Sequence, residues 1–202
     1  MTLGRFILIV AMTVMVAVGG NYGWQAWKEK EQIEKLTPIM TKATILLTDT
    51  VAQLDNKISF SDAIKLLSKR TEEINSLNID ILAFPSAPNA YIHKTALDYT
   101  NAELAYLRSV SRLIERLFRY KSISDSLDNY TSDDGLETSY GRQRAIKAYE
   151  SAKEAETEYK EAMDEVTASK KKLINAADSA AKHYPSQSVI RKDVLENVLS
   201  GS

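Results

Sequence analysis

The chain contains no cysteine and only four prolines and seven glycines among its 202 residues. Without cysteine it has no disulfide, no thiolate nucleophile and no cysteine-ligated metal. Few prolines and glycines favour long helices over a strand-rich fold with many turns. The 26 basic and 27 acidic residues leave a formal net charge of −1. This balance gives the protein no overall attraction to nucleic acid.

Motifs that signal catalysis or cofactor binding are also missing from the sequence. There is no glycine pattern for a dinucleotide or a phosphate, no nucleophile elbow and no zinc-ligand spacing. The two histidines, His93 and His183, carry no signal of a neighbouring carboxylate or nucleophile. The acidic stretch 125–134 lacks the first and last carboxylates of an EF-hand loop. The sequence therefore predicts a protein that is not an enzyme and binds no metal or cofactor.

One long hydrophobic run stands at the N-terminus. Residues 6–24 carry no charge and have the length that a helix needs to cross a bilayer, roughly 17–25 residues. Four residues are expected to anchor this helix at the membrane interfaces, namely Arg5 on one side and Tyr22, Trp24 and Trp27 on the other. The positive charge before the run predicts a cytoplasmic N-terminus.

A cleaved signal peptide is the alternative interpretation of the same run. Ala17 and Gly19 would then be the small residues at positions −3 and −1 of the cleavage site. The three aromatic residues favour the uncleaved anchor, and both alternatives export the remaining chain. We expect a single-pass protein of a bacterial inner membrane with its bulk in the periplasm, or a secreted protein if the signal is cleaved.

The rest of the chain has the apolar periodicity of long helices separated by turns. Turns are expected at 56–59, at the proline-containing segment 84–89 and at the polar stretch 128–135. Pro38 predicts either a kink or a restart of the first helix with Thr37 as its N-cap. The expected helices after the membrane run are 25–54, 61–83, 91–127, about 136–184, and a short amphipathic helix from Ser188.

These elements predict an all-α fold, an antiparallel bundle of about four helices with coiled-coil-like packing, preceded by one N-terminal transmembrane helix. The expected divisions are a signal-anchor at 1–27, an extracytoplasmic bundle at 28–184, and a short C-terminal amphipathic helix with its tail at 185–202. A seven-residue repeat of small side chains predicts that the last long helix packs closely against an antiparallel neighbour. The repeat consists of Ala148, Ala155, Ala162, Ser169 and Ala176.

Two rows of opposite charge support the same pairing. Arginines at three- and four-residue spacing line one side of the third long helix, and glutamates line one side of the fourth. The rows are Arg108, Arg112, Arg116 and Arg119, and Glu150, Glu154, Glu158, Glu161 and Glu165. In an antiparallel hairpin they would face each other as ion pairs. The alternative function of the arginine row is to bind an anion or an acidic partner.

Without a chemical motif, the leading hypothesis is a non-enzymatic scaffold or adaptor of the cell envelope. It would be tethered through its N-terminal helix and would bind an envelope protein through an exposed helix face. A homo-oligomer is compatible with this role, whereas nucleic acid is not an expected partner. The second hypothesis is a sensory module that recognises an anionic or small-molecule ligand between its helices.

Overall fold

The computed structural model describes residues 3–56, 58–85, 89–131, 139–191 and Val194, and for residues 3–21 and 128–131 it describes the backbone alone. Within these residues the chain forms four α-helices and one 3-10 turn, without a strand. The elements are α1 (Leu3–Asp55), α2 (Phe60–Ala83), α3 (Ala90–Thr131), α4 (Ser139–Ala180) and η2 (Ser186–Ser188). The predicted all-α helical bundle is confirmed.

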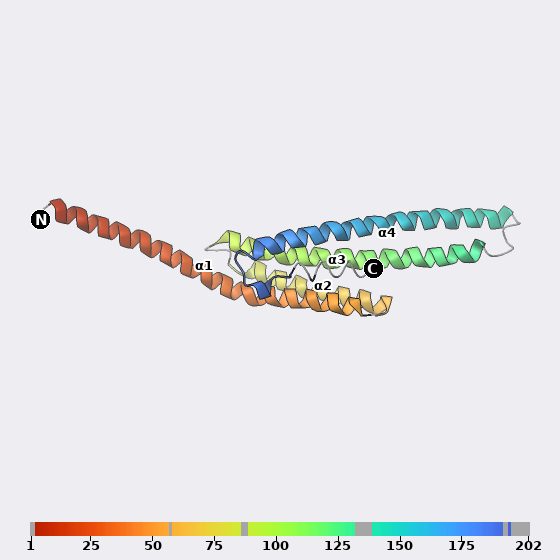
Figure 1. The fold of residues 1–202 in the computed structure, drawn as a ribbon, viewed down its shortest axis with the longest axis horizontal. Helices are drawn as coiled ribbons and strands as arrows, with labels where there is room; N and C mark the ends of the chain where they lie inside the picture. The colour runs from red at the N-terminus through yellow and green to blue at the C-terminus, as the bar shows by residue number, and fades with distance from the viewer. Residues whose placement is uncertain (1–2, 57, 86–88, 132–138, 192–193, 195–202) are drawn as a thin grey trace.

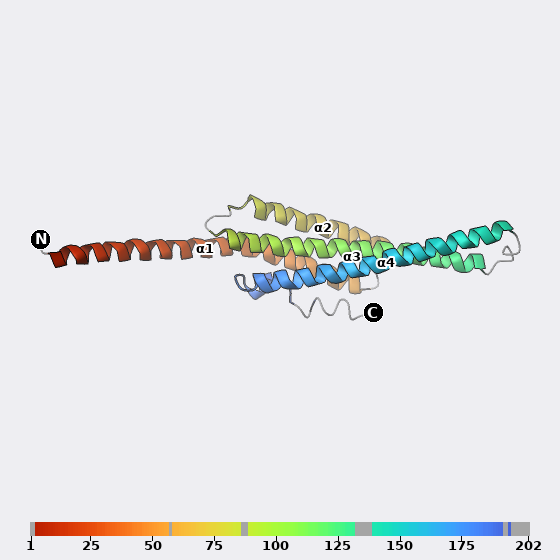
Figure 2. The ribbon, with the colours of Figure 1, turned by 90° about the horizontal axis from the view of Figure 1, so that it is seen from above.

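The helices form two antiparallel hairpins of unequal length. Figure 1 shows α3 and α4 side by side along their lengths, and the shorter α1–α2 hairpin packed along the first part of α3. The first part of α1 projects from one end of the bundle, and the far half of the α3–α4 hairpin projects from the other (Figure 2). Only the middle of the molecule is therefore a bundle of four helices.

The predicted transmembrane helix falls mainly on residues whose side chains are not described. The backbone of α1 is helical from Leu3, but Arg5 and most of the run 6–24 lie outside the residues with described side chains. In the part of the chain that could be searched, no helix is both long and apolar enough to cross a membrane. The membrane segment thus stays a prediction.

Pro38 lies inside α1, which continues through it, so the predicted restart with Thr37 as N-cap is wrong. The Thr37 hydroxyl instead donates to the carbonyl of Ile33, at 2.7 Å. The helix changes direction where it enters the bundle (Figure 1). Proline removes one backbone donor, and apolar residues on both sides of it, including the fully buried Leu36 and Met40, hold α1 against its neighbours.

The core lies between the two hairpins. Its largest fully buried apolar side chains are Leu36, Met40 and Leu47 of α1, Leu67, Ile74 and Ile81 of α2, Tyr99, Tyr106 and Leu107 of α3, and Leu173 of α4. The apolar side chains of α3 are buried only in its first part. Leu117 is 45% exposed, because the α1–α2 hairpin ends at this level of α3, where Phe60 at the start of α2 stacks on Phe118.

Small side chains bring α4 close to α3, as the repeat predicts. Ala155, Ala162 and Ser169 are buried, and the hydroxyl of Ser169 lies 2.6 Å from that of Ser109 on α3. A larger side chain at these positions would push the two helices apart. The seven-residue repeat therefore sets the spacing of the longest hairpin.

The C-terminal part departs from the sequence prediction. α4 ends at Ala180 rather than Tyr184, and the expected helix does not begin at Ser188, because Val189 has extended backbone angles (φ −131°, ψ 134°). Ser188 and Ile190 are buried beside α1 and α3, where side chains bind their backbone. Val194 is helical, and the rest of the predicted amphipathic helix lies outside the described residues.

Replacing the buried Ala155 by leucine is expected to destabilise the protein by about 1–3 kcal/mol, because the added carbon atoms have no space between α3 and α4. The measurement is urea unfolding followed by far-UV circular dichroism. The control is Met163→Leu, which changes an exposed side chain of α4. Equal stabilities for the two variants would contradict the close packing.

Candidate functional sites

Three arginines of the α3 row pair with two glutamates of the α4 row, as expected for an antiparallel hairpin. Arg112 pairs with Glu165 at 3.1 Å, and Arg116 and Arg119 both reach Glu158 at 2.6 Å. Arg108 is exposed one turn earlier. These pairs are solvent-accessible, so each contributes only about 0–1 kcal/mol to stability. Their main effect is on the register of the hairpin.

A hollow of about 190 Å³ lies between the rows, but its charge does not favour an anion. Its lining includes Arg112 and Arg116 together with three carboxylates, those of Glu158, Glu161 and Glu165. The negative charge of the glutamates offsets the positive charge that would be needed to bind a phosphate or an acidic peptide. The arrangement thus supports an ion-paired hairpin surface better than an anion site.

The two histidines lie at the same end of the bundle, and each has a structural neighbour. His93 is buried, and its Nε2 lies 2.7 Å from the carbonyl oxygen of Ile81 in the last turn of α2. The ring of His183 meets the ring of Tyr91 edge-on at 5.3 Å. Among the described residues, no group of three or more histidines and acids is placed to hold a metal ion.

The predicted aromatic anchors are exposed on the part of α1 that projects from the bundle. Tyr22, Trp24 and Trp27 are all more than half exposed. The ammonium group of Lys28 lies 4.8 Å from the centre of the Trp27 ring and 5.9 Å from that of Trp24. Arg5 lies outside the residues with described side chains. Exposed tryptophan on a helix is typical of a contact with a partner or a membrane interface.

A buried polar cluster, which the sequence analysis missed, joins α1, α3 and the C-terminal segment. The Thr44 hydroxyl lies 2.9 Å from the Tyr99 hydroxyl and donates to the carbonyl of Ser188 at 3.0 Å. The Tyr99 hydroxyl accepts a hydrogen bond from the backbone N–H of Ile190 at 2.6 Å. Glu103 Oε1 lies 3.4 Å from Thr44 Oγ1. The cluster therefore fixes the extended segment against the bundle.

Glu103 is fully buried in this cluster, and its Oε2 has no hydrogen-bond partner among the described residues. Burial raises the pKa of Glu103 to about 8, although hydrogen bonds from Tyr99 and Thr44 act in the opposite direction. The carboxyl group is thus mostly protonated at neutral pH. The spacing of Tyr99, Glu103 and Tyr106 (i, i+4, i+7) could have revealed that this acid shares the buried face of α3.

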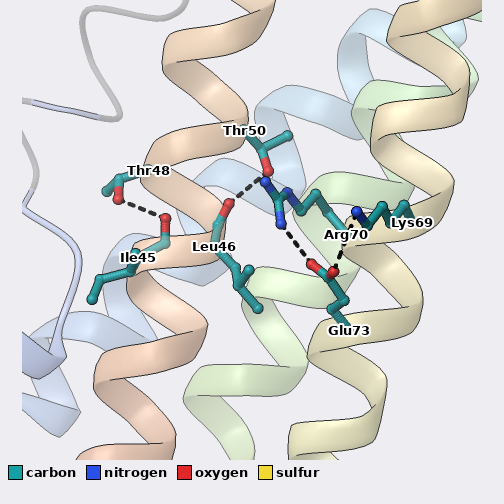
Figure 3. A network of polar contacts seen from close by, with 7 residues as sticks. All are labelled: Ile45, Leu46, Thr48, Thr50, Lys69, Arg70 and Glu73. Carbon is teal, nitrogen blue, oxygen red and sulfur yellow. Dashed lines mark hydrogen bonds and ion pairs between the residues drawn. The ribbon is translucent and has the colours of Figure 1, made fainter.

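A smaller set of polar side chains lies between α1 and α2 (Figure 3), with Thr50 buried and Lys69 exposed. Glu73 pairs with Arg70 at 2.7 Å and with Lys69 at 4.0 Å, all on α2. On the adjoining turn of α1, the Thr50 hydroxyl donates to the carbonyl of Leu46 at 2.6 Å. These contacts are local to each helix, so they neither join the two helices nor form a site.

An open apolar groove lies at the step where the α1–α2 hairpin ends against α3. It encloses about 770 Å³, and the rings of Phe60 and Phe118 stack in it with centroids 4.1 Å apart. Leu117 and Phe118 remain 45% and 52% exposed. Its lining consists of Leu54, Ile58, Phe60, Ala63, Ile114, Leu117 and Phe118, with Lys121, Ser122, Asp125 and Ser126 along one edge. Of the sites described here, this groove has the strongest features of a binding surface.

Comparisons of the chain with family models, with curated proteins and with solved structures found no match.

Replacing Glu103 by glutamine is expected to stabilise the protein increasingly as the pH rises. The pKa of Glu103 is higher in the folded state than its ordinary value of 4.5, so the unfolded chain loses this proton first. The contribution of Glu103 to stability is complete below pH 4.5 and is lost as the pH approaches 8. The stability difference between E103Q and the parent chain should widen by roughly 1.4 kcal/mol per pH unit in this window.

The measurement is urea unfolding at several values between pH 5 and pH 8, which gives the free energy of unfolding for both chains. Glu154→Gln on the exposed side of α4 is the matched control, and its difference from the parent should change little with pH. A pH-independent difference for E103Q would show that this carboxyl group is ionised inside the fold.

Proposed function

We propose that this protein is a membrane-tethered, non-enzymatic helical bundle of the bacterial cell envelope that binds a protein partner. The observation that carries the proposal is the open groove with the stacked, partly exposed rings of Phe60 and Phe118. Contiguous exposed apolar surface is uncommon on a protein without partners. The N-terminal hydrophobic run supplies the tether.

The position of the groove suits a tethered binding module. α1 leaves the bundle at one end, and the groove lies where α1 and α2 meet at the other end of their hairpin (Figure 1). From Trp27 to Leu54 the helix rises about 40 Å at 1.5 Å per residue. With Trp27 at a membrane interface, the groove would lie about that far from the bilayer. A partner in the extracytoplasmic space could reach it.

The shape and chemistry of the groove suit an amphipathic helix of the partner. Apolar side chains of such a helix would cover Leu117 and Phe118, as in other helix-in-groove complexes. Lys121 and Asp125 along one edge carry opposite charges on successive turns of α3. A partner helix with the complementary order of charges would bind in one direction.

A small-molecule ligand is the second candidate, and the size of the groove supports it. Its volume of about 770 Å³ lies within the range of ligand pockets, roughly 300–1,000 Å³. The arginine row gives weaker support for an anionic ligand, since Arg112, Arg116 and Arg119 are paired with glutamates. This alternative makes the protein a sensor.

The tether is tested by cell fractionation and intact-mass measurement. We expect the full-length mass in the membrane fraction, and a periplasmic reporter fused to the C-terminus should be active. Loss of about twenty residues would show a cleaved signal peptide. A fusion that is active only in the cytoplasm would overturn the exported topology.

The groove is tested with a photo-crosslinking amino acid at Leu117. We expect one recurring protein adduct in cells, with its yield reduced severalfold by Phe118→Asp, because an aspartate would place a charge in the apolar contact. The control carries the crosslinker at Met163, an exposed residue of α4 outside the groove lining.

The same adduct from both positions would contradict a specific contact in the groove. No adduct together with a small molecule retained in native mass spectra, and lost in the Phe118→Asp variant, would favour the sensor over the adaptor.

A further inference from the structure

Exposed apolar side chains gather at the end of the bundle from which α1 emerges. Leu82, in the last turn of α2, is 64% exposed, and Tyr91, in the first turn of α3, is 55% exposed. Ile79 is similarly exposed one turn before Leu82. The first part of α1 projects beyond this end (Figure 1), and the exposed Trp24 and Trp27 lie on α1 shortly before Glu29, which binds Asn89 at the start of α3. Exposed apolar side chains are thus present both on α1 and at the adjoining end of the bundle.

Hydrogen bonds hold the residues at the end of α2 and the start of α3 at a fixed position along α1. The Asn89 side-chain amide donates to Glu29 at 2.8 Å, and its backbone N–H donates to the side chain of Gln32 at 3.3 Å. The side-chain amide of Gln32 also donates to the carbonyl of Pro85 at 3.5 Å. Gln32 is five residues beyond Trp27, which is about 7.5 Å along a helix.

The same asparagine connects this contact to α3. The side-chain oxygen of Asn89 accepts from the backbone N–H groups of Tyr91 and Ile92, at 3.0 and 3.3 Å. Asn89 thus caps the start of α3 while it binds α1. The height of Tyr91 relative to the tryptophans is therefore set by the fold.

We propose that this end of the bundle rests on the bilayer surface, with Leu82 and Tyr91 in contact with the lipid headgroup region. The inference depends on the proposed tether. A bilayer has about 5–8 Å of headgroup region on each side of its hydrocarbon core. Trp24 and Trp27 at the edge of the hydrocarbon would place the α2–α3 connection at the outer headgroups. The usual helix tilt of about 20° would lower one side of the bundle further.

The charges near this end indicate which lipids it would contact. On α1, Lys28 and Lys35 pair with Glu31, at 3.3 and 2.8 Å, and Lys30 pairs with Glu34 at 3.9 Å. These three lysines of α1 are therefore balanced by neighbouring acids. Contact would rely on aromatic and apolar side chains, so zwitterionic phosphatidylcholine should suffice and anionic lipid should add little.

The test uses spin labels on the full-length chain in phosphatidylcholine bilayers. Since the sequence has no cysteine, single variants Leu82→Cys and Tyr91→Cys can be labelled without background. Collision with oxygen, which concentrates in lipid, is compared with collision with a water-soluble nickel complex. Val14→Cys in the predicted membrane helix is the lipid reference, and Met163→Cys on α4 is the exposed reference in water.

We expect severalfold higher oxygen-to-nickel ratios at positions 82 and 91 than at 163, and the highest ratio at 14. Ratios at 82 and 91 equal to that at 163, with a lipid-like ratio at 14, would overturn the contact and leave the tether intact. A water-like ratio at 14 would overturn the tether itself, and the contact with it. Leu82, Tyr91 and Met163 are all exposed. Their cysteine variants should therefore give the same circular dichroism spectrum as the parent chain.

Discussion

The close approach of α3 and α4 is the constraint on which the rest of the architecture depends. α3 packs against each of the other three helices, and its contact with α4 is the longest. That contact is possible because Ala155, Ala162 and Ser169 present little volume to α3. Because α3 and α4 extend beyond the end of the α1–α2 hairpin, the apolar face of α3 is exposed near Leu117. The groove follows from unequal hairpin lengths.

Buried polar groups determine how the remaining parts attach to α3. The Asn78 side chain of α2 accepts from the Thr100 hydroxyl and donates to Asn101, while Thr44 of α1 and Tyr99 hold the C-terminal segment. A buried polar group without a hydrogen-bond partner destabilises the folded state. These hydrogen bonds therefore oppose a shift of one helix along its neighbour. Glu103 Oε2 lacks a hydrogen-bond partner among the described residues, as do Tyr106 Oη and Arg70 Nε, and burial of the charged form raises the pKa of Glu103. A site retained at that cost is a candidate for function.

Local patterns in the sequence were sufficient for the four long helices, the end of the second helix before Pro85, the small-residue repeat and the pairing of arginines with glutamates between α3 and α4. Each depends on spacing along one helix or between two adjacent ones. The groove could not be predicted in this way, because it depends on where α1 and α2 end relative to α3. Glu103 was hidden because an acid is normally assigned to the surface. The extended backbone at Val189 comes from tertiary hydrogen bonds at Thr44 and Tyr99, which override the local preference for helix.

The two proposed contacts lie at opposite ends of the α1–α2 hairpin, and this separation limits what the partner can be. α1 continues from the exposed tryptophans through Pro38 to Leu54 in the groove. With the near end held at the lipid surface by both α1 and the α2–α3 connection, rotation of the bundle about α1 would be restricted. The groove would then face a narrow set of directions at a fixed height of about 40 Å. A partner wholly embedded in the bilayer could not reach it, whereas one that projects a helix into the extracytoplasmic space could.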